Sequence, residues 1–189
     1  SILYRTNSQS RVIEDELRKS GIAYNIIGGV KFYERKEIKD LICYLRVIVN
    51  PDDSVSLDRI INFPPRGLGA TTITKIQEYR ESNSKSFYES LQDCLNISLP
   101  VKQTDTITKF CNLINKYKNI STSQKGSVLL QDLLNDINLK DFYYNQKTED
   151  AINRWENIEE FISSIVEYES SNNGLGLSSF LEEISLLTD

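Results

Sequence analysis

The sequence predicts a mainly α-helical protein that begins with a small β-α-β piece. From residue 29 onward, apolar residues recur every three or four positions, the spacing that puts them on one face of a helix. Before that point, two short apolar runs flank one helix-like segment. A turn rich in proline and glycine separates two of the later helices. These observations divide the chain into a β-α-β piece at 1–28 and a helical domain at 29–189.

The β-α-β piece is predicted from three consecutive segments. "ILY" at 2–4 and "AYNII" at 23–27 have the apolar character of short buried strands. The helix between them begins at a cap near Ser8 or Ser10 and ends at Gly21. A lone unit of this size cannot bury both faces of its sheet. We therefore interpret this piece as part of a larger α/β domain.

The helical domain is predicted from apolar stripes that repeat along the rest of the chain. Each stripe marks the face of a helix that packs into a core. The stripes extend over residues 38–48, 73–79, 87–95, 107–117, 130–137, 152–165 and 180–187. Segments rich in serine, asparagine and glycine at 119–127 and 170–176 are predicted to be loops.

The stretch "NFPPRGLGATTITKI" at 62–76 predicts a sharp turn between two helices. Its two adjacent prolines cannot continue a helix, so the preceding apolar segment must end near Asn62. Gly67 and Gly69 can adopt positive φ and allow a backbone or a ligand to come close. Leu68, between the two glycines, can enter a core.

The helix after this turn offers a place for an anion. Thr71 or Thr72 can cap that helix. Its first N–H groups and the positive end of its dipole, with Arg66 nearby, suit a phosphate group. The alternative is a tight turn that only connects two packed helices.

Composition places the chain among globular proteins and narrows its chemistry. Hydrophobic residues make up 39% and charged residues 26% of the 189 residues. No apolar run approaches a membrane span and the N-terminus lacks an export signal, so we expect a cytoplasmic protein without membrane association. Three widely spaced cysteines fit buried thiols better than disulfides or zinc ligands. Histidine is absent, which removes the commonest general base and metal ligand.

The distribution of charge matters more than the net charge of −5. Residues 1–80 carry 13 Lys and Arg against 10 Asp and Glu, whereas residues 81–189 carry 9 against 17. The Gly-Leu-Gly turn lies in the basic part, which makes a local phosphate-binding patch plausible in an acidic chain. Such a patch holds few phosphates, so we expect weak, salt-sensitive DNA binding by this chain alone.

No catalytic or nucleotide-binding site is predicted within the chain. The Gly-x-x-x-x-Gly-Lys-Ser/Thr loop that holds nucleotide phosphates is absent from the sequence. Carboxylates occur in helical clusters such as Glu14 to Glu16, which are typical of solvated helix faces. We expect no metal site.

Four motifs along the chain carry a family resemblance. They are "LYRTNSQSR" at 3–11, "GGVKFYERKEIKDLICYLRVIVNPDD" at 28–53, "PPRGLGATT" at 64–72 and "RWENIEEF" at 154–161. In order and approximate spacing they resemble the central part of UvrD/PcrA/Rep-type DNA helicases of superfamily one. The resemblance is nearly unbroken from Ile2 to Ile76, and the sequence is individual over much of the remainder.

The resemblance implies a fragment of an ATP-dependent helicase that moves 3′ to 5′ on single-stranded DNA. It implies that residues 1–28 belong to the second RecA-like domain of that family, called 2A. Residues 29–189 then correspond to the helical insertion called 2B, with a helix-hairpin-helix-like turn. ATP and Mg²⁺ are expected in the parent protein outside these residues, so this fragment should have no ATPase activity and no cofactor of its own.

The resemblance also implies two DNA contacts. Arg5, Thr6 and Asn7 match positions beside the single-stranded DNA track, where a cation and an amide can hold phosphates. The Gly-Leu-Gly turn matches the loop with which 2B holds the duplex ahead of the fork. Leu68 stands where the family often has isoleucine, which leaves the turn chemistry unchanged. The expected duplex-binding residues are Arg66, Gly67, Leu68, Gly69, Thr71, Thr72 and Lys75.

Two other classes of function remain open at this point. One is a non-enzymatic helical module for protein contacts, because 2B in this family also meets partner proteins and regulates the motor. The acidic C-terminal half suits a basic partner. The other is a purely structural helical domain whose glycine turn only connects helices.

Overall fold

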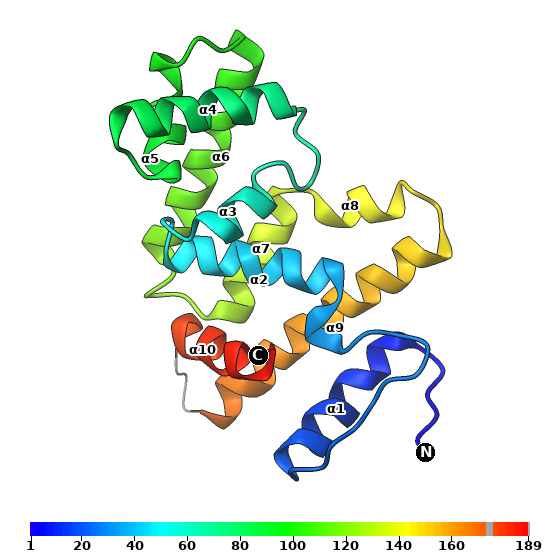
Figure 1. The fold of residues 1–189 in the computed structure, drawn as a ribbon. Coiled ribbons are helices and arrows are strands. Elements are labelled where there is room, and N and C mark those ends of the chain that lie inside the picture. Colours follow the sequence, from blue (N-terminus) through cyan, green and yellow to red (C-terminus); the bar gives the residue numbers. More distant parts are fainter. Residues whose placement is uncertain (173–175, 189) are drawn as a thin grey trace. The chain divides into compact units, whose positions relative to one another are not determined.

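The structure is a computed structural model that describes residues 1–172 and 176–188, with side chains described as far as residue 186. Its described part is mainly helical, as predicted (Figure 1). The α-helices are α1 (Ser10–Lys19), α2 (Lys36–Val49), α3 (Ser54–Ile60), α4 (Ala70–Asn83), α5 (Phe87–Gln92), α6 (Val101–Ile120), α7 (Gly126–Asp136), α8 (Leu139–Tyr144), α9 (Glu149–Ser171) and α10 (Leu177–Thr188). The 3-10 helices are η1 (Asn7–Gln9), η2 (Phe32–Glu34) and η3 (Cys94–Asn96).

Several helices begin at capping side chains that the sequence supplies. Asp53 accepts a hydrogen bond from the N–H of Ser56 at the start of α3. Ser86 and Glu89 form a reciprocal capping box at the start of α5. Thr148 caps α9 in the same way as Asp53 caps α3. These caps satisfy N–H groups that have no partner within their own helix.

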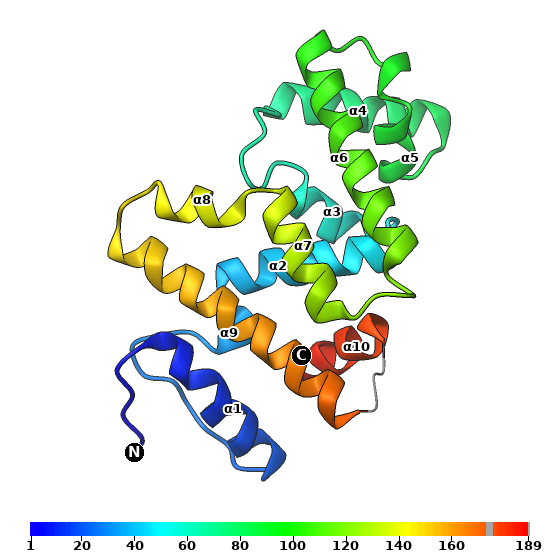
Figure 2. The ribbon, with the colours of Figure 1, turned by 180° about the vertical axis from the view of Figure 1, so that it is seen from behind.

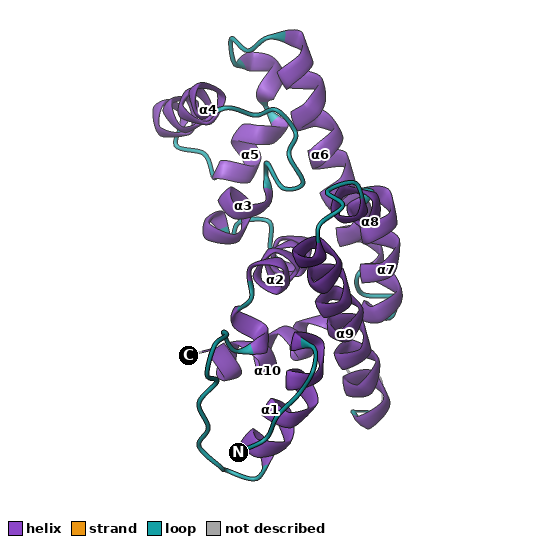
Figure 3. Ribbon diagram, turned by 90° about the vertical axis from the view of Figure 1, so that its right-hand side faces the viewer, coloured by secondary structure: helices purple, strands orange, loops and turns teal. Residues whose placement is uncertain are grey.

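The predicted β-α-β piece is only partly present. The helix forms as α1 and ends before Gly21, whose φ of +67° is the left-handed conformation that glycine favours. Neither 2–4 nor 23–27 forms a strand, and the described residues contain only helices and loops (Figure 3). Both segments line a cavity of about 500 Å³ beside α1. They remain unpaired because an extended segment becomes a strand only when a neighbour takes up its N–H and C=O groups.

The chain divides into two compact units, each described here by itself. The first unit consists of residues 1–41 and 125–189, and the second consists of residues 42–124. The division falls within α2. The predicted boundary after residue 28 concerns the domains of a parent helicase and stays a prediction.

The first unit has its core on α9. This helix packs against α7 and α8, as Figure 2 shows from behind, and α10 packs against η2. The apolar stripes predicted for these helices supply the buried side chains, which include Phe32, Ile38, Leu129, Leu133, Ile158, Phe161, Ile165 and Phe180. Residues 173–175 of the loop predicted at 170–176 and the side chain of Leu187 lie outside the described residues.

The second unit is built from α3 to α6 and the end of α2. Helix α5 packs against α3, α4 and α6. Its buried side chains include Leu45, Leu57, Ile60, Ile76, Phe87, Leu91, Ile107, Phe110 and Ile114. Leu95 was predicted to continue the stripe of α5, but it is 83% exposed because that helix ends at Gln92.

Candidate nucleic-acid interface

The proline-glycine turn of the second unit connects α3 to α4. The Phe63–Pro64 peptide bond is cis. Gly67 has a φ of +75°, so it needs the left-handed conformation that a glycine adopts without strain. Gly69 has a φ of −79°, and a side chain built there meets no atom within 4 Å. The expectation of positive φ at both glycines is therefore wrong for Gly69, which any residue could occupy.

Two side chains fix the turn to the core of the second unit. Leu68 is 3% exposed, as predicted for a plug between the glycines. Thr72 is 2% exposed and lies in the first turn of α4. The N-cap of α4 is Gly69, so the prediction of a threonine cap is wrong. The helix begins two residues earlier than a cap at Thr71 allows, and it lacks a capping side chain.

The start of α4 presents free backbone donors. Within the described chain, the N–H groups of Gly69, Ala70 and Thr71 make no hydrogen bond, and all three residues are exposed. The next N–H, that of Thr72, already donates to the carbonyl oxygen of Gly69 at 3.0 Å. Uncapped N–H groups at the positive end of a helix dipole are suited to bind an anion.

Arg66 does not point away from the turn. Its Nη1 donates to the carbonyl oxygens of Ile60 at 2.9 Å, Ile61 at 3.2 Å and Phe63 at 2.6 Å. These oxygens lie at the C-terminal end of α3 and just after it, where carbonyl groups have no partner further along the helix. The positive guanidinium therefore caps α3 at the negative end of its dipole.

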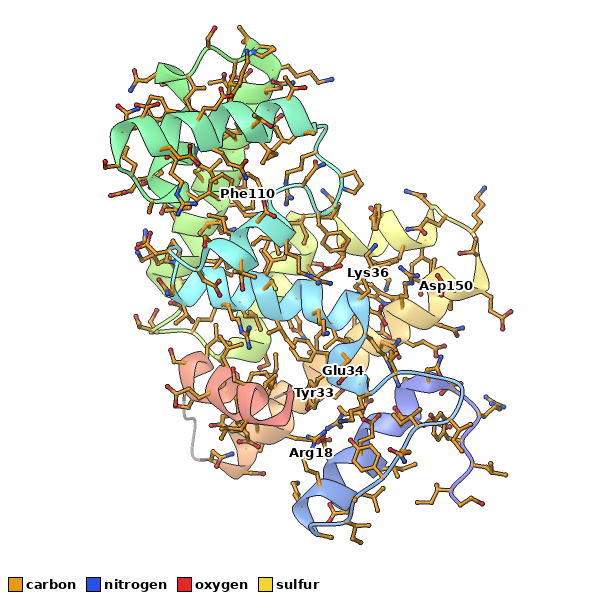
Figure 4. The ribbon with its side chains drawn as sticks, in the orientation of Figure 1. Arg18, Tyr33, Glu34, Lys36, Phe110 and Asp150 are labelled. Atoms are coloured by element: carbon orange, nitrogen blue, oxygen red, sulfur yellow. The ribbon has the colours of Figure 1, made fainter. Side chains whose placement is uncertain are left out.

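The other side of the guanidinium is also in contact with the second unit. Nη2 of Arg66 donates to the hydroxyl of Tyr44, which in turn donates to the carbonyl oxygen of Phe63. The guanidinium carbon lies 5.0 Å from the ring centre of Phe110, which Figure 4 labels. Tyr44 is fully buried, so its hydroxyl adds a polar connection between the turn and the core.

Asn62 closes the turn and was missed as a functional residue. Its side-chain oxygen accepts from the N–H of Arg66 at 2.8 Å and of Leu68 at 3.3 Å. Its side-chain nitrogen donates to the carbonyl oxygen of Leu68 at 3.0 Å. The signal was present in the sequence, because asparagine before a proline-glycine segment commonly bonds to the nearby backbone.

Lys75 is exposed on α4 and reaches a neighbouring loop. Its Nζ donates to the carbonyl oxygen of Ser98 at 2.8 Å. The amine keeps further donors that face solvent, because a lysine ammonium carries three. Lys75 therefore adds a positive charge to the exposed side of α4.

The second unit is the basic one. Its residues 42–124 carry 10 Lys and Arg against 8 Asp and Glu, a net charge of +2. The first unit carries 12 against 19, a net charge of −7. The two units of the structure thus have net charges of opposite sign. The free N–H groups of α4 belong to the positively charged unit, which attracts anions.

The three residues predicted to lie beside single-stranded DNA belong to the first unit. Arg5 and Asn7 are exposed. Thr6 is the N-cap of η1, and the backbone N–H groups of Arg5 and Thr6 both donate to the side-chain oxygen of Gln9. Their segment thus has a defined backbone and exposes Arg5 and Asn7.

A buried polar network holds that segment and was not foreseen. Arg35 donates from Nη1 to the backbone oxygen of Asn7 at 2.9 Å and to the side-chain oxygen of Asn157 at 2.8 Å. Its Nη2 donates to the hydroxyl of Ser10 at 2.6 Å. Asn157 in turn donates to Glu37 at 2.6 Å. Burial lowers the pKa of Arg35, although neighbouring carboxylates oppose that effect.

The network joins the motifs that carried the family resemblance. Ser10 donates to Glu14 at 2.7 Å, and both carboxylate oxygens of Glu14 accept from the N–H of Phe32 at 3.2 Å. Residues from the motifs at 3–11, 28–53 and 154–161 therefore meet in one place. Their polar identities in the sequence were the available signal, but the pairing depends on the tertiary fold.

A second arginine of the first unit is surrounded by carboxylates. Arg11 is 3% exposed and donates to Glu160 at 2.6 Å, to both oxygens of Glu167 at 3.0 and 3.1 Å, and to Asp15 at 3.1 Å. Burial lowers the pKa of Arg11, but the hydrogen bonds to Glu167 and Glu160 outweigh it and raise the pKa overall. Figure 4 shows Arg18 near Tyr33 in the same unit, 5.7 Å from the ring centre.

No described helix is long and apolar enough to cross a membrane. In the same residues, no group of three or more His, Cys, Asp or Glu side chains could hold a metal ion.

The family of the chain is decided by comparison with known proteins. A profile of the UvrD-like helicase C-terminal domain matches residues 1–189, which is the whole chain.

The chain belongs to the UvrD-like helicase family. This UvrD-like domain is 40% identical over 189 residues to the ATP-dependent DNA helicase PcrA of Bacillus subtilis. It is 39% and 38% identical over 191 residues to the PcrA helicases of Staphylococcus epidermidis and Staphylococcus aureus. Each alignment covers 100% of this chain and 26% of the relative, so the UvrD-like domain spans about a quarter of the curated relatives it matches. The division into 2A and 2B stays a prediction.

Proposed function

We propose that this chain is the duplex-contacting part of an ATP-dependent DNA helicase that moves 3′ to 5′ along single-stranded DNA and that the region regulates unwinding. Family membership and the relatives' name support the parent activity. We expect ATP and Mg²⁺ to bind outside these residues, because the sequence has no Gly-x-x-x-x-Gly-Lys-Ser/Thr phosphate-binding loop. We assign both to other parts of the parent, and we expect no ATP hydrolysis from residues 1–189 alone.

The duplex contact is carried by the uncapped start of α4. The free N–H groups of Gly69, Ala70 and Thr71 can donate to a phosphate without reading base sequence. The absence of a side chain at Gly69 lets a DNA backbone come close to these donors. The net charge of +2 on the second unit adds long-range attraction.

The other predicted duplex-binding residues support this contact in different ways. Gly67 provides the left-handed turn, and the buried Leu68 and Thr72 hold the turn on its core. Lys75 contributes charge from the exposed side of α4. Arg5, Thr6 and Asn7 are proposed to contact the single strand in the parent protein, where Arg5 and Asn7 offer a cation and an amide.

The substitution Gly69→Ser tests the duplex contact without disturbing the fold. Serine is a preferred N-cap residue and suits the backbone at φ −79°, ψ 169°. Its hydroxyl satisfies an N–H that the phosphate is proposed to use. We expect the melting temperature to be unchanged or slightly raised and the affinity for forked duplex DNA to fall by about threefold to tenfold, as for one lost contact.

The measurement is fluorescence anisotropy with forked duplex DNA at low and moderate salt, paired with a thermal melt. The control is Arg80→Ala, which removes an exposed charge from the same helix and leaves its first turn intact. If Gly69→Ser binds the fork as tightly as the wild type does, the turn is structural and the duplex contact is wrong.

A protein-contact module is the second candidate. The net charge of −7 on the first unit favours a basic protein partner over a nucleic acid. Absence of any salt-dependent fork binding by the wild-type chain favours this candidate over the duplex contact.

A further inference from the structure

We propose that Arg66 is a positioning residue of the duplex-binding turn and does not itself contact a phosphate. Its guanidinium fixes the C-terminal end of α3, and the fixed turn then presents the N–H groups of α4. This inference rests on the proposed function, because it concerns the same turn. It reverses the role that the sequence suggested for an arginine beside two glycines.

The hydrogen bonds of Arg66 leave little of its guanidinium for a ligand. Nη1 donates to three carbonyl oxygens and Nη2 donates to the hydroxyl of Tyr44. One face of the group lies against the ring of Phe110 at 5.0 Å. A phosphate contact by these nitrogens would compete with the capping of α3, whose terminal carbonyls would then lose a charged donor.

The acceptors also explain why this position needs arginine. A guanidinium is a planar fork that can donate in two directions at once, whereas a lysine ammonium is a compact point charge. Only the fork reaches the carbonyls after α3 and the hydroxyl of Tyr44 together. Lysine would preserve the positive charge and lose this geometry.

A substitution at Tyr44 tests independently whether Arg66 acts by positioning the turn. Its side chain is 0% exposed, so it cannot touch a bound duplex. Its hydroxyl accepts from Arg66 and donates to the carbonyl oxygen of Phe63. Tyr44→Phe therefore loosens the attachment of Arg66 and leaves every charge of the second unit in place.

The experiment compares Arg66→Lys, Arg66→Ala and Tyr44→Phe with the wild-type chain, using Arg80→Ala as the charge control. Forked-duplex affinity is measured by anisotropy at a temperature well below every melting transition. Amide hydrogen exchange is followed at Phe63 and Leu68, whose N–H groups bond within the turn. We expect Arg66→Lys to bind about tenfold and Tyr44→Phe about threefold more weakly, each with faster exchange at these amides.

The outcomes separate positioning from direct contact. If Arg66→Lys restores wild-type affinity while Arg66→Ala lowers the salt slope by about 0.9, the arginine touches a phosphate and the inference is wrong. Unchanged amide exchange in Arg66→Lys also overturns it. If the wild-type chain binds no duplex, the proposed function fails, and the exchange data still decide whether Arg66 orders the turn.

Discussion

Arg66 of the second unit and Arg11 and Arg35 of the first unit differ in the charges that surround them. In the second unit, Arg66 bonds to carbonyl oxygens and to a hydroxyl, all of which are neutral. In the first unit, Arg11 bonds to three carboxylates and Arg35 lies within the electrostatic influence of Glu14 and Glu37. In the first unit, nearby carboxylates therefore neutralise the buried arginines. In the second unit, no acceptor of Arg66 neutralises its positive charge. An arginine can thus strengthen attraction to DNA without touching it.

The largest expected effect comes from Arg35→Ala in the first unit. It removes the buried cation that faces Glu14 and Glu37, and it removes the donor to the side-chain oxygen of Asn157 and to the hydroxyl oxygen of Ser10. Removing one member of a buried charged network costs about 3–5 kcal/mol. We expect this loss in the free energy of unfolding by urea denaturation, with Arg80→Ala within about 0.5 kcal/mol of the wild type. A loss as small as that of Arg80→Ala shows that the network is not structurally important.

Arg11→Ala sharpens the comparison through its salt dependence. The side chain of Glu167 is 63% exposed, so part of this network is screened by solvent. We expect a loss of about 1.5–3 kcal/mol at low salt, as for hydrogen bonds to charged groups. This loss should shrink as salt rises, whereas that of Arg66→Ala should stay constant because its acceptors are neutral. If the stability losses of Arg11→Ala and Arg66→Ala depend equally on salt, the proposed difference between charged and neutral acceptors is wrong.

Asp15→Asn gives the smallest effect and tests the same network through pH. Burial raises the pKa of Asp15 above its ordinary value of 3.8, although Arg11 and Arg18 oppose the shift. A raised pKa in the folded state means that Asp15 stabilises the fold below pH 3.8 and that this contribution is lost as pH rises through the folded-state pKa. As pH rises over that interval, the wild type loses stability that Asp15→Asn does not lose. The melting temperature of Asp15→Asn should therefore rise relative to that of the wild type. A difference that is independent of pH contradicts the shift.

The helices could be predicted because their signal is local. A repeat of three or four residues depends only on the helix itself, so stripes such as 38–48 and 107–117 became buried faces. The prediction of strands at 2–4 and 23–27 was wrong because a strand depends on a neighbouring strand that its own sequence does not specify. The prediction that Leu95 is buried was wrong because the sequence marks the end of a helix less clearly than its middle.

The turn could also be located from the sequence, but the role of its residues could not. Prolines and glycines mark a turn wherever they occur, and Leu68 was correctly placed in the core. The partners of Arg66 include Tyr44 and Phe110, which are far from it in the sequence. The direction of a long side chain follows from such neighbours, which periodicity and composition do not reveal.

The order of the two units along the chain has a consequence for synthesis on the ribosome. The second unit is continuous, so all of its residues have been made once Gln124 is added. The first unit is split, and its residues 1–41 must wait for the segment that begins at Lys125. During that interval Arg35 has no Asn157 to bond, and Arg11 has neither Glu160 nor Glu167. All residues of the basic unit are therefore present in the nascent chain before those of the acidic unit are complete.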